Sequence, residues 1–280
     1  MAQKKSDEAE KQKPNGTVLA ETGYFARTSR PVYALIFLLP FIITYEILVL
    51  LVNPQLLTEP VSNIRGAVVS FVWVQNFLYY VGMDTKSAWL FAPVFVMLTL
   101  LILQLFSRQS WKIKFSDLFI MVIECLVLAV PLIVLALVLN RGANAPANSV
   151  RLLYDSGSHN MAMNLLTGIG AGIYEELIFR LILISISMMF FETILGVRRM
   201  KAIVISVIIS SVLFSLHHHF VFLNGQFAVS EKFTVIPFAF RTIAGVFFAV
   251  IFAARGFGIT AGTHSFYDII ATLINAWLSG

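Results

Sequence analysis

The chain has 280 residues, of which 58% are hydrophobic and only 12% are charged, and its formal net charge is +5. An ordinary soluble domain is about 25% charged, so this composition excludes a water-soluble globular core and indicates a membrane protein with several spans. The basic residues flank the apolar runs, as orientation in a membrane requires, and no basic stripe interleaved with aromatics points to nucleic acid. The single cysteine, Cys125, excludes an intrachain disulfide and a CxxC metal or redox site.

Residues 1–30 are predicted to be a disordered cytoplasmic tail. They are rich in lysine, glutamate and aspartate and contain almost no large apolar side chain before Tyr24, a composition that cannot form a core. No short apolar region with a small-residue cleavage site follows the basic start, so the segment does not read as a signal peptide. The integral membrane domain is therefore predicted to fill residues 31–280.

A membrane-crossing helix needs about 20 predominantly apolar residues. Seven stretches of the chain meet this requirement: 31–52, 88–106, 117–139, 161–190, 202–217, 235–254 and 257–279. The stretch 66–82 is shorter and contains Gln75 and Asn76, so it is either an eighth span or an interfacial or re-entrant segment. If it does not cross, most lysines and arginines fall on one side, which predicts a cytoplasmic N-terminus. The fold predicted is an all-α, polytopic transmembrane bundle of seven to eight spans.

The stretch 161–190 contains the most informative motif, Glu175-Glu176-x-x-x-Arg180. A charged side chain at the centre of a bilayer costs about 2.5–3.5 kcal/mol on insertion scales, so charged residues that persist there usually pair or serve a function. Glu176 and Arg180 are four residues apart and share one helix face, which predicts an ion pair. Glu175 lies about 100° around the helix and remains available for chemistry.

Two further polar clusters lie in or near predicted spans. The first is the run His217-His218-His219, in which His218 lies four residues after Phe214. The second is His264-x-x-x-Asp268, whose two polar side chains share a helix face. A carboxylate and a histidine that face one polar cavity can activate a water, and a second histidine can stabilise an oxyanion. Two histidines and a carboxylate are also a catalytic zinc set, although no HExxH helix and no GxSxG elbow occurs.

The order Glu175-Glu176-x-x-x-Arg180, Phe214-x-x-x-His218 and His264-x-x-x-Asp268, on separate apolar helices, resembles the CPBP family of CAAX proteases and bacteriocin-processing membrane proteins. The resemblance covers about residues 160–275. It implies an intramembrane glutamate endopeptidase that needs no metal and no cofactor. The implied partners are the lipid bilayer and a peptide or prenylated-protein substrate.

The resemblance also implies a role for each residue. Glu175 would activate water with the help of His218, and His264 with Asp268 would stabilise the oxyanion. An ionised aspartate cannot donate a hydrogen bond, so orienting His264 is the role expected of Asp268. Glu176 and Arg180 would hold the helix in place, while the flanking residues His217 and His219 are expected at the membrane interface.

Other functions fit the same residues. The alternative is a non-catalytic membrane scaffold or a bacteriocin-immunity or regulatory protein of the same fold. A proton- or ion-coupled transporter also uses buried charges, but no pair of broken helices in repeated halves is evident. Glu46 and Glu124 match no motif, and either is expected to pair structurally with Arg241. Short loops favour the cell membrane of a prokaryote.

Overall fold

The computed structural model describes residues 23–52, 68–142, 161–223, 226–229 and 232–279. Its elements, in chain order, are α3 (Tyr24–Thr28), α4 (Pro31–Val52), α5 (Val69–Tyr80), α6 (Thr85–Ser107), α7 (Phe115–Gly142), α8 (Met161–Glu176), η4 (Leu177–Ile184), α9 (Ser185–Met189), η5 (Phe190–Ile194), α10 (Arg199–His219), β1 (Phe220–Leu223), β2 (Gln226–Val229), α11 (Val235–Arg255) and α12 (Phe257–Ser279). The prediction of an all-α bundle is confirmed. Within the described ranges the only strands are those of the short antiparallel hairpin β1–β2, which lies between the predicted spans 202–217 and 235–254.

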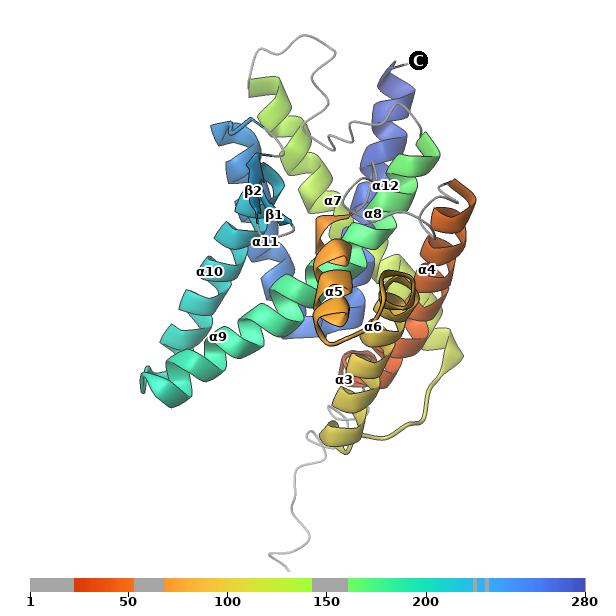
Figure 1. Cartoon of the computed structure of the whole chain (residues 1–280), viewed down its shortest axis with the longest axis vertical. Helices are drawn as coiled ribbons and strands as arrows, with labels where there is room; N and C mark the ends of the chain where they lie inside the picture. Colours follow the sequence, from red (N-terminus) through yellow and green to blue (C-terminus); the bar gives the residue numbers. More distant parts are fainter. Residues whose placement is uncertain (1–22, 53–67, 143–160, 224–225, 230–231, 280) are drawn as a thin grey trace, which may run out of the picture.

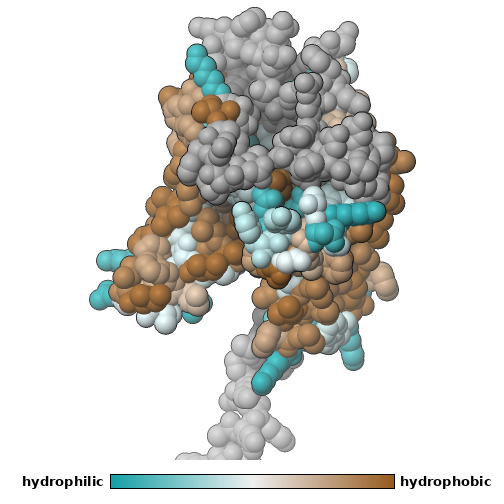
Figure 2. Space-filling view, in the orientation of Figure 1, coloured by the Kyte–Doolittle hydropathy of each residue, from teal (hydrophilic) through white to brown (hydrophobic). Residues whose placement is uncertain are grey.

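Six helices of the described chain are long and apolar enough to cross a membrane: 31–49, 85–107, 115–139, 161–194, 199–219 and 235–255. Hydrophobic side chains cover most of the described surface on the face shown in Figure 2. The protein is therefore a multi-pass membrane protein. The helix α5 has 12 residues and is about 18 Å long, which is too short to cross a hydrocarbon core of about 30 Å.

The predicted span at 257–279 is a helix of the right length, α12, with 23 residues, but it is not among the six. The reason is its polar content, because His264, Asp268, Ser265 and three threonines are buried along it. These residues are tolerated because α12 lies inside the bundle, packed against α4, α7, α8 and α11. Figure 1 shows α8 and α12 side by side at the centre of the molecule, with α4 and α7 beside them.

The central contact between α8 and α12 depends on glycine. A Cβ added to Gly172 would meet the Ser265 side chain, and it would lie 2.6 Å from the Ser265 backbone nitrogen and 2.9 Å from the Ala261 carbonyl oxygen. A Cβ added to Gly168 would lie 2.7 Å from the Cβ of Asp268. Small residues allow helix backbones to approach closely within a membrane. Here they bring the Glu-Glu segment of α8 next to the His-Asp segment of α12.

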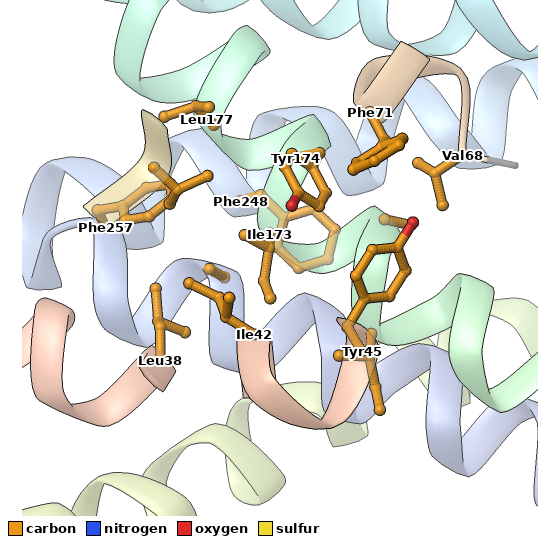
Figure 3. Close-up of a cluster of buried hydrophobic side chains, with 14 of the residues drawn as sticks. Leu38, Ile42, Tyr45, Val68, Phe71, Ile173, Tyr174, Leu177, Phe248 and Phe257 are labelled. Atoms are coloured by element: carbon orange, nitrogen blue, oxygen red, sulfur yellow. The ribbon is translucent and has the colours of Figure 1, made fainter. Parts of the chain in front are cut away.

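The apolar core lies directly against the Glu-Glu segment. Figure 3 shows side chains of α4, α5 and α8 meeting around Tyr174. The Tyr174 ring is fully buried, with centroids 5.0 Å from Phe71 and 5.7 Å from Tyr45. Because Tyr174 immediately precedes Glu175, this packing fixes the rotation of α8 and so the direction in which Glu175 points.

The end of the predicted tail is ordered. Residues 24–28 form α3, and Arg27 donates two hydrogen bonds to Asp117 of α7, with distances of 2.8 and 3.0 Å. Asp117 also accepts a hydrogen bond of 3.0 Å from the Tyr33 hydroxyl. The prediction of disorder up to residue 30 was wrong for residues 24–30, because charged partners on other helices hold this segment. Residues 1–22 lie outside the described chain.

A second polar network joins α3 to α7 and to the end of α11. Arg255 donates to both carboxylate oxygens of Glu124, with distances of 2.5 and 2.8 Å, and to the Thr28 hydroxyl at 2.8 Å. The Tyr24 hydroxyl donates to Glu124 at 2.7 Å. The expected pairing of Glu124 with Arg241 was therefore wrong, because Arg255 lies closer in space although it is farther along the chain. Glu46 instead accepts a hydrogen bond of 3.4 Å from the Tyr174 hydroxyl.

Candidate active site

Glu175 and Glu176 form the last turn of α8, and both are buried, with 5% and 0% of their surface exposed. The helix continues without a break beyond them, but it widens to a π-helix at Leu177–Ile184. Such widened turns are rare and are frequent at functional sites. The change of helix type begins immediately after the two carboxylates and includes Arg180.

The predicted ion pair between Glu176 and Arg180 is confirmed. Arg180 Nε lies 3.1 Å from Glu176 Oε2, and neither side chain is exposed. The guanidinium also donates to the Gly245 carbonyl at 3.4 Å. It lies over the ring of Phe214, 4.2 Å from the centroid, so the charge is held by a carboxylate, a carbonyl and an aromatic face together.

Glu175 contacts a histidine of α10, but this histidine is His217. The Nε2 atom of His217 lies 3.2 Å from Glu175 Oε1, and its Nδ1 atom contacts the Phe214 carbonyl. A carbonyl oxygen can only accept, so Nδ1 carries a proton in this contact. Nε2 then faces a carboxylate oxygen of Glu175. Both of these atoms are acceptors, so a hydrogen bond between them requires one further proton. Glu175 and His217 therefore lie within hydrogen-bonding distance of each other.

His218 lies beside this pair. Its Nδ1 atom is 3.0 Å from the Phe214 carbonyl oxygen and 3.2 Å from Nδ1 of His217. Ligand atoms of Glu175, His217 and His218 all lie within 4.8 Å of one another. The structure therefore places the predicted residue His218 at the site, where it contacts His217 and the Phe214 carbonyl. Among the residues that the structure describes, these three side chains could also hold a metal ion.

The expectation that His217 and His219 lie at the membrane interface was wrong. Their exposed fractions are 6% and 0%. His219 packs between aromatic rings, with centroids 5.2 Å from Phe233 and 6.3 Å from Phe238, which indicates a structural role. A sequence signal for His217 did exist, because Ser206, Ser210, Phe214 and His217 follow a helical spacing of four, four and three residues and are all buried.

His264 lies among three carboxylates. Its Nδ1 atom is 2.8 Å from Glu176 Oε1, and its Nε2 atom is 3.5 Å from Asp268 Oδ2 and 3.9 Å from Glu175 Oε2. The imidazole stacks on Phe248, with a centroid distance of 4.5 Å and an interplanar angle of 19°. The sequence analysis predicted that Asp268 orients the His264 ring. The structure adds Glu176, which contacts Arg180 with one oxygen and His264 with the other.

The short helix α5 reaches the same site. The ring of Trp73 lies 5.9 Å from His217 and 6.2 Å from Phe179, measured between centroids. Phe179 in turn lies 4.8 Å from His217. An aromatic wall, formed by Trp73 of the short helix α5 and Phe179 of η4, therefore lies next to the contact between Glu175 and His217.

The side chains that converge here, all buried except the partly exposed His218, are Glu175, Glu176 and Arg180 from α8 and η4, His217 and His218 from α10, and His264 and Asp268 from α12. Together they can accept a proton, deliver it and stabilise a negative charge, which is the set of tasks in general acid–base hydrolysis.

The comparisons with known proteins agree with this chemistry. The profile of the family described as "Rce1-like: Type II CAAX prenyl endopeptidase Rce1-like" matches residues 157–270. No curated protein and no solved structure matches the chain. The matched stretch runs through α8 to α12 and contains the three motifs that resemble the CPBP family. Residues 157–270 of this chain are therefore similar to the family of CAAX-protease-like membrane proteins.

Proposed function

We propose that the protein is a membrane-embedded endopeptidase of the CAAX-protease-like type, which hydrolyses a peptide bond of a peptide or prenylated protein with water activated by Glu175. The observation that carries the proposal is the convergence of Glu175, His217 and His264 from three different helices, in which both histidines approach the buried Glu175 carboxylate. A purely structural network would not need two histidines whose ring nitrogens both face the carboxylate of Glu175.

In the proposed first step, Glu175 accepts a proton from a water molecule as the water oxygen attacks the scissile carbonyl carbon. The carbonyl oxygen becomes an oxyanion, and the proton is shared with His217, whose Nε2 lies 3.2 Å from Glu175. In the second step the carbon–nitrogen bond breaks and the same proton passes to the leaving amine. The water is consumed, and one carboxyl and one amine group are formed, so no further reactant is required.

The oxyanion is proposed to be stabilised by His264. Since Nδ1 of His264 is held by Glu176 at 2.8 Å, the doubly protonated imidazole presents its Nε2–H to the developing negative charge. Asp268, 3.5 Å from that nitrogen, favours this charged form and orients the ring. The resemblance implies no metal, and a carboxylate base with a histidine needs none.

The test is cleavage of prenylated C-a-a-X peptides and of leader-type peptides in liposomes. Wild type is compared with Glu175→Gln, with and without a chelator. We expect the substitution to abolish cleavage and the chelator to leave it unchanged. The matched control is Glu192→Gln, which changes a carboxylate of the same long helical segment, in η5, away from the site.

Loss of activity with the chelator would replace the glutamate mechanism by a metal centre at Glu175, His217 and His218. If well-folded wild type cleaves no peptide of the panel, the proposal fails, and the scaffold or immunity role takes its place.

A further inference from the structure

The hairpin β1–β2 has no role in the proposed mechanism, although it begins at the site. The helix α10 ends at His219, and Phe220 already has an extended backbone, with φ −127° and ψ 122°. The strand β1 therefore starts directly after the histidine run that contains His217 and His218. Figure 1 shows the hairpin at the end of α10.

One edge of β1 is not covered by another strand. The sheet of the described chain has two strands, in the order β1–β2, so β1 pairs with β2 along one edge only. The residues at the open end of the hairpin, Phe220 and Val229, are 45% and 69% exposed. An uncovered strand edge is a template for pairing with another chain.

The register identifies the backbone groups on this free edge. Leu223 pairs with Gln226, and these are the first and last residues of a four-residue turn, which a hydrogen bond joins. Hydrogen-bonded and non-hydrogen-bonded pairs alternate along an antiparallel ladder, so the next pair, Phe222 with Phe227, is not hydrogen-bonded within the hairpin. The N–H and C=O groups of Phe222 therefore point away from β2, and those of Phe227 point away from β1.

Phe220 adds a second acceptor to the free edge of β1. It lies two residues before Phe222, so its backbone groups point to the same side of the strand. Its N–H donates to the Leu216 carbonyl at the end of α10. The free edge of β1 thus presents the carbonyl oxygens of Phe220 and Phe222 and the N–H of Phe222.

The free edge lies on the side of the active site. Phe233 follows β2 in the chain and packs on His219, with centroids 5.2 Å apart, so the chain that leaves β2 covers the His219 side of α10. His217 and His219 are separated by about 200° around the helix. The edge of β1 opposite β2 therefore faces the side of His217, which contacts Glu175.

An open sheet edge in a membrane protein requires a polar environment. Such an edge is tolerated at membrane depth only where it is buried in protein or lines a water-filled cavity. The proposed hydrolysis needs water at Glu175, so the free edge of β1 fits the wall of the cavity that admits this water. A peptide that lies along this wall would bond to the edge with its own backbone.

We infer that the substrate binds as an extended strand that pairs with the free edge of β1, beside the scissile bond. The inference rests on the proposed function. Main-chain hydrogen bonds supply the affinity in this mode of binding, so it accepts substrates of different sequence. The substrate N–H groups that donate to Phe220 and Phe222 belong to residues two positions apart, because successive N–H groups of a strand point to opposite edges.

The experiment uses a prenylated C-a-a-X peptide that is extended before the cysteine. Away from the scissile bond, one amide N–H at a time is replaced by an ester oxygen, which removes a single donor. The specificity constant kcat/KM of wild type is measured in liposomes. We expect replacements at two positions, separated by one residue, to lower kcat/KM by about 2- to 10-fold each, the contribution of one hydrogen bond. The replacement between them should have no effect.

The variant Phe222→Pro tests the same edge from the side of the enzyme. Proline is tolerated where the N–H points away from the neighbouring strand, so the hairpin should persist while the donor is lost, and kcat/KM should fall by a similar factor. Phe222→Ala keeps the N–H and should fall less. The matched control is Phe227→Pro, which removes the corresponding N–H on the free edge of β2 and should leave kcat/KM unchanged.

Ester replacements without effect, or with effects that lack the spacing of two, would overturn the inference. So would equal losses in Phe222→Pro and Phe227→Pro, because a general disturbance of the hairpin would act in that way, and so would equal losses in Phe222→Pro and Phe222→Ala. Binding of the same peptides to Glu175→Gln separates the inference from the proposed function. The spacing of two in binding supports strand pairing even if no peptide is cleaved, and its absence refutes it. If Phe222→Pro fails to fold, the ester series with wild type decides the question.

Discussion

Replacement of Arg180 by methionine should destabilise the protein strongly. Arg180 and Glu176 are both completely buried, with Nε and Oε2 3.1 Å apart. Removal of one partner of a buried ion pair leaves an uncompensated charge and costs about 3–5 kcal/mol. For a chain of this size each kcal/mol shifts the Tm by about 2–4 °C, so the expected loss is about 6–20 °C.

The double variant Arg180→Met with Glu176→Gln tests the physical reason. The double variant leaves no unpaired charge in the buried site, so its Tm should return most of the way to that of wild type. The two substitutions should therefore show strong coupling in a double-mutant cycle. Activity should remain low, because Glu176 also holds Nδ1 of His264 at 2.8 Å. Recovery of stability without recovery of activity would separate the two roles of Glu176.

The assay is thermal unfolding in detergent, followed by tryptophan fluorescence and by the monodisperse fraction in size-exclusion chromatography. Arg199→Met is the control for loss of a positive charge at an exposed position. An unchanged Tm in Arg180→Met, or a double variant that loses the sum of the two single losses, would refute the reasoning.

Three further predictions concern other parts of the bundle. His217→Gln should lower kcat/KM more than His218→Gln, since only His217 contacts Glu175 directly, and the reverse order would return the proton-exchanging role to His218. Gly172→Ala should cost about 1–3 kcal/mol, as overpacking does, and should lower activity by moving α8 away from α12; a normal Tm would show that the contact with Ser265 can relax. Arg255→Met should release α3 and speed cleavage by trypsin after Arg27 or Arg30, measured by mass spectrometry, and unchanged cleavage would mean that the contact between Arg27 and Asp117 is sufficient to hold α3.

Much of the site was predictable because polar and charged side chains are energetically costly inside a membrane. Glu175, Glu176, Arg180, His264 and Asp268 are polar side chains within apolar stretches, and a membrane makes such residues conspicuous in a sequence. The same cost explains why the Glu176–Arg180 pair could be predicted from spacing alone, since both partners lie on one helix.

The contacts that could not be predicted have a different cause. The choice between His217 and His218 depends on how α10 is rotated against α8, and adjacent residues on a helix differ by only about 100°. The pairing of Glu124 with Arg255, and the folding of α3 onto α7, join segments that are far apart in the chain. Hydropathy and spacing describe one helix at a time, so they carry no information about which neighbour a side chain meets.

The sequence by itself determined that this is a helical membrane protein whose last helices carry a carboxylate, histidine and arginine set, because apolar length and the cost of buried charge are properties of single segments. Only the tertiary structure decided that α12 lies inside the bundle, that Glu176 connects Arg180 to His264, and that His217 contacts Glu175. These facts depend on the distances between helices, which are set by close packing of small residues such as Gly168 and Gly172 and not by the spacing of residues along any one helix.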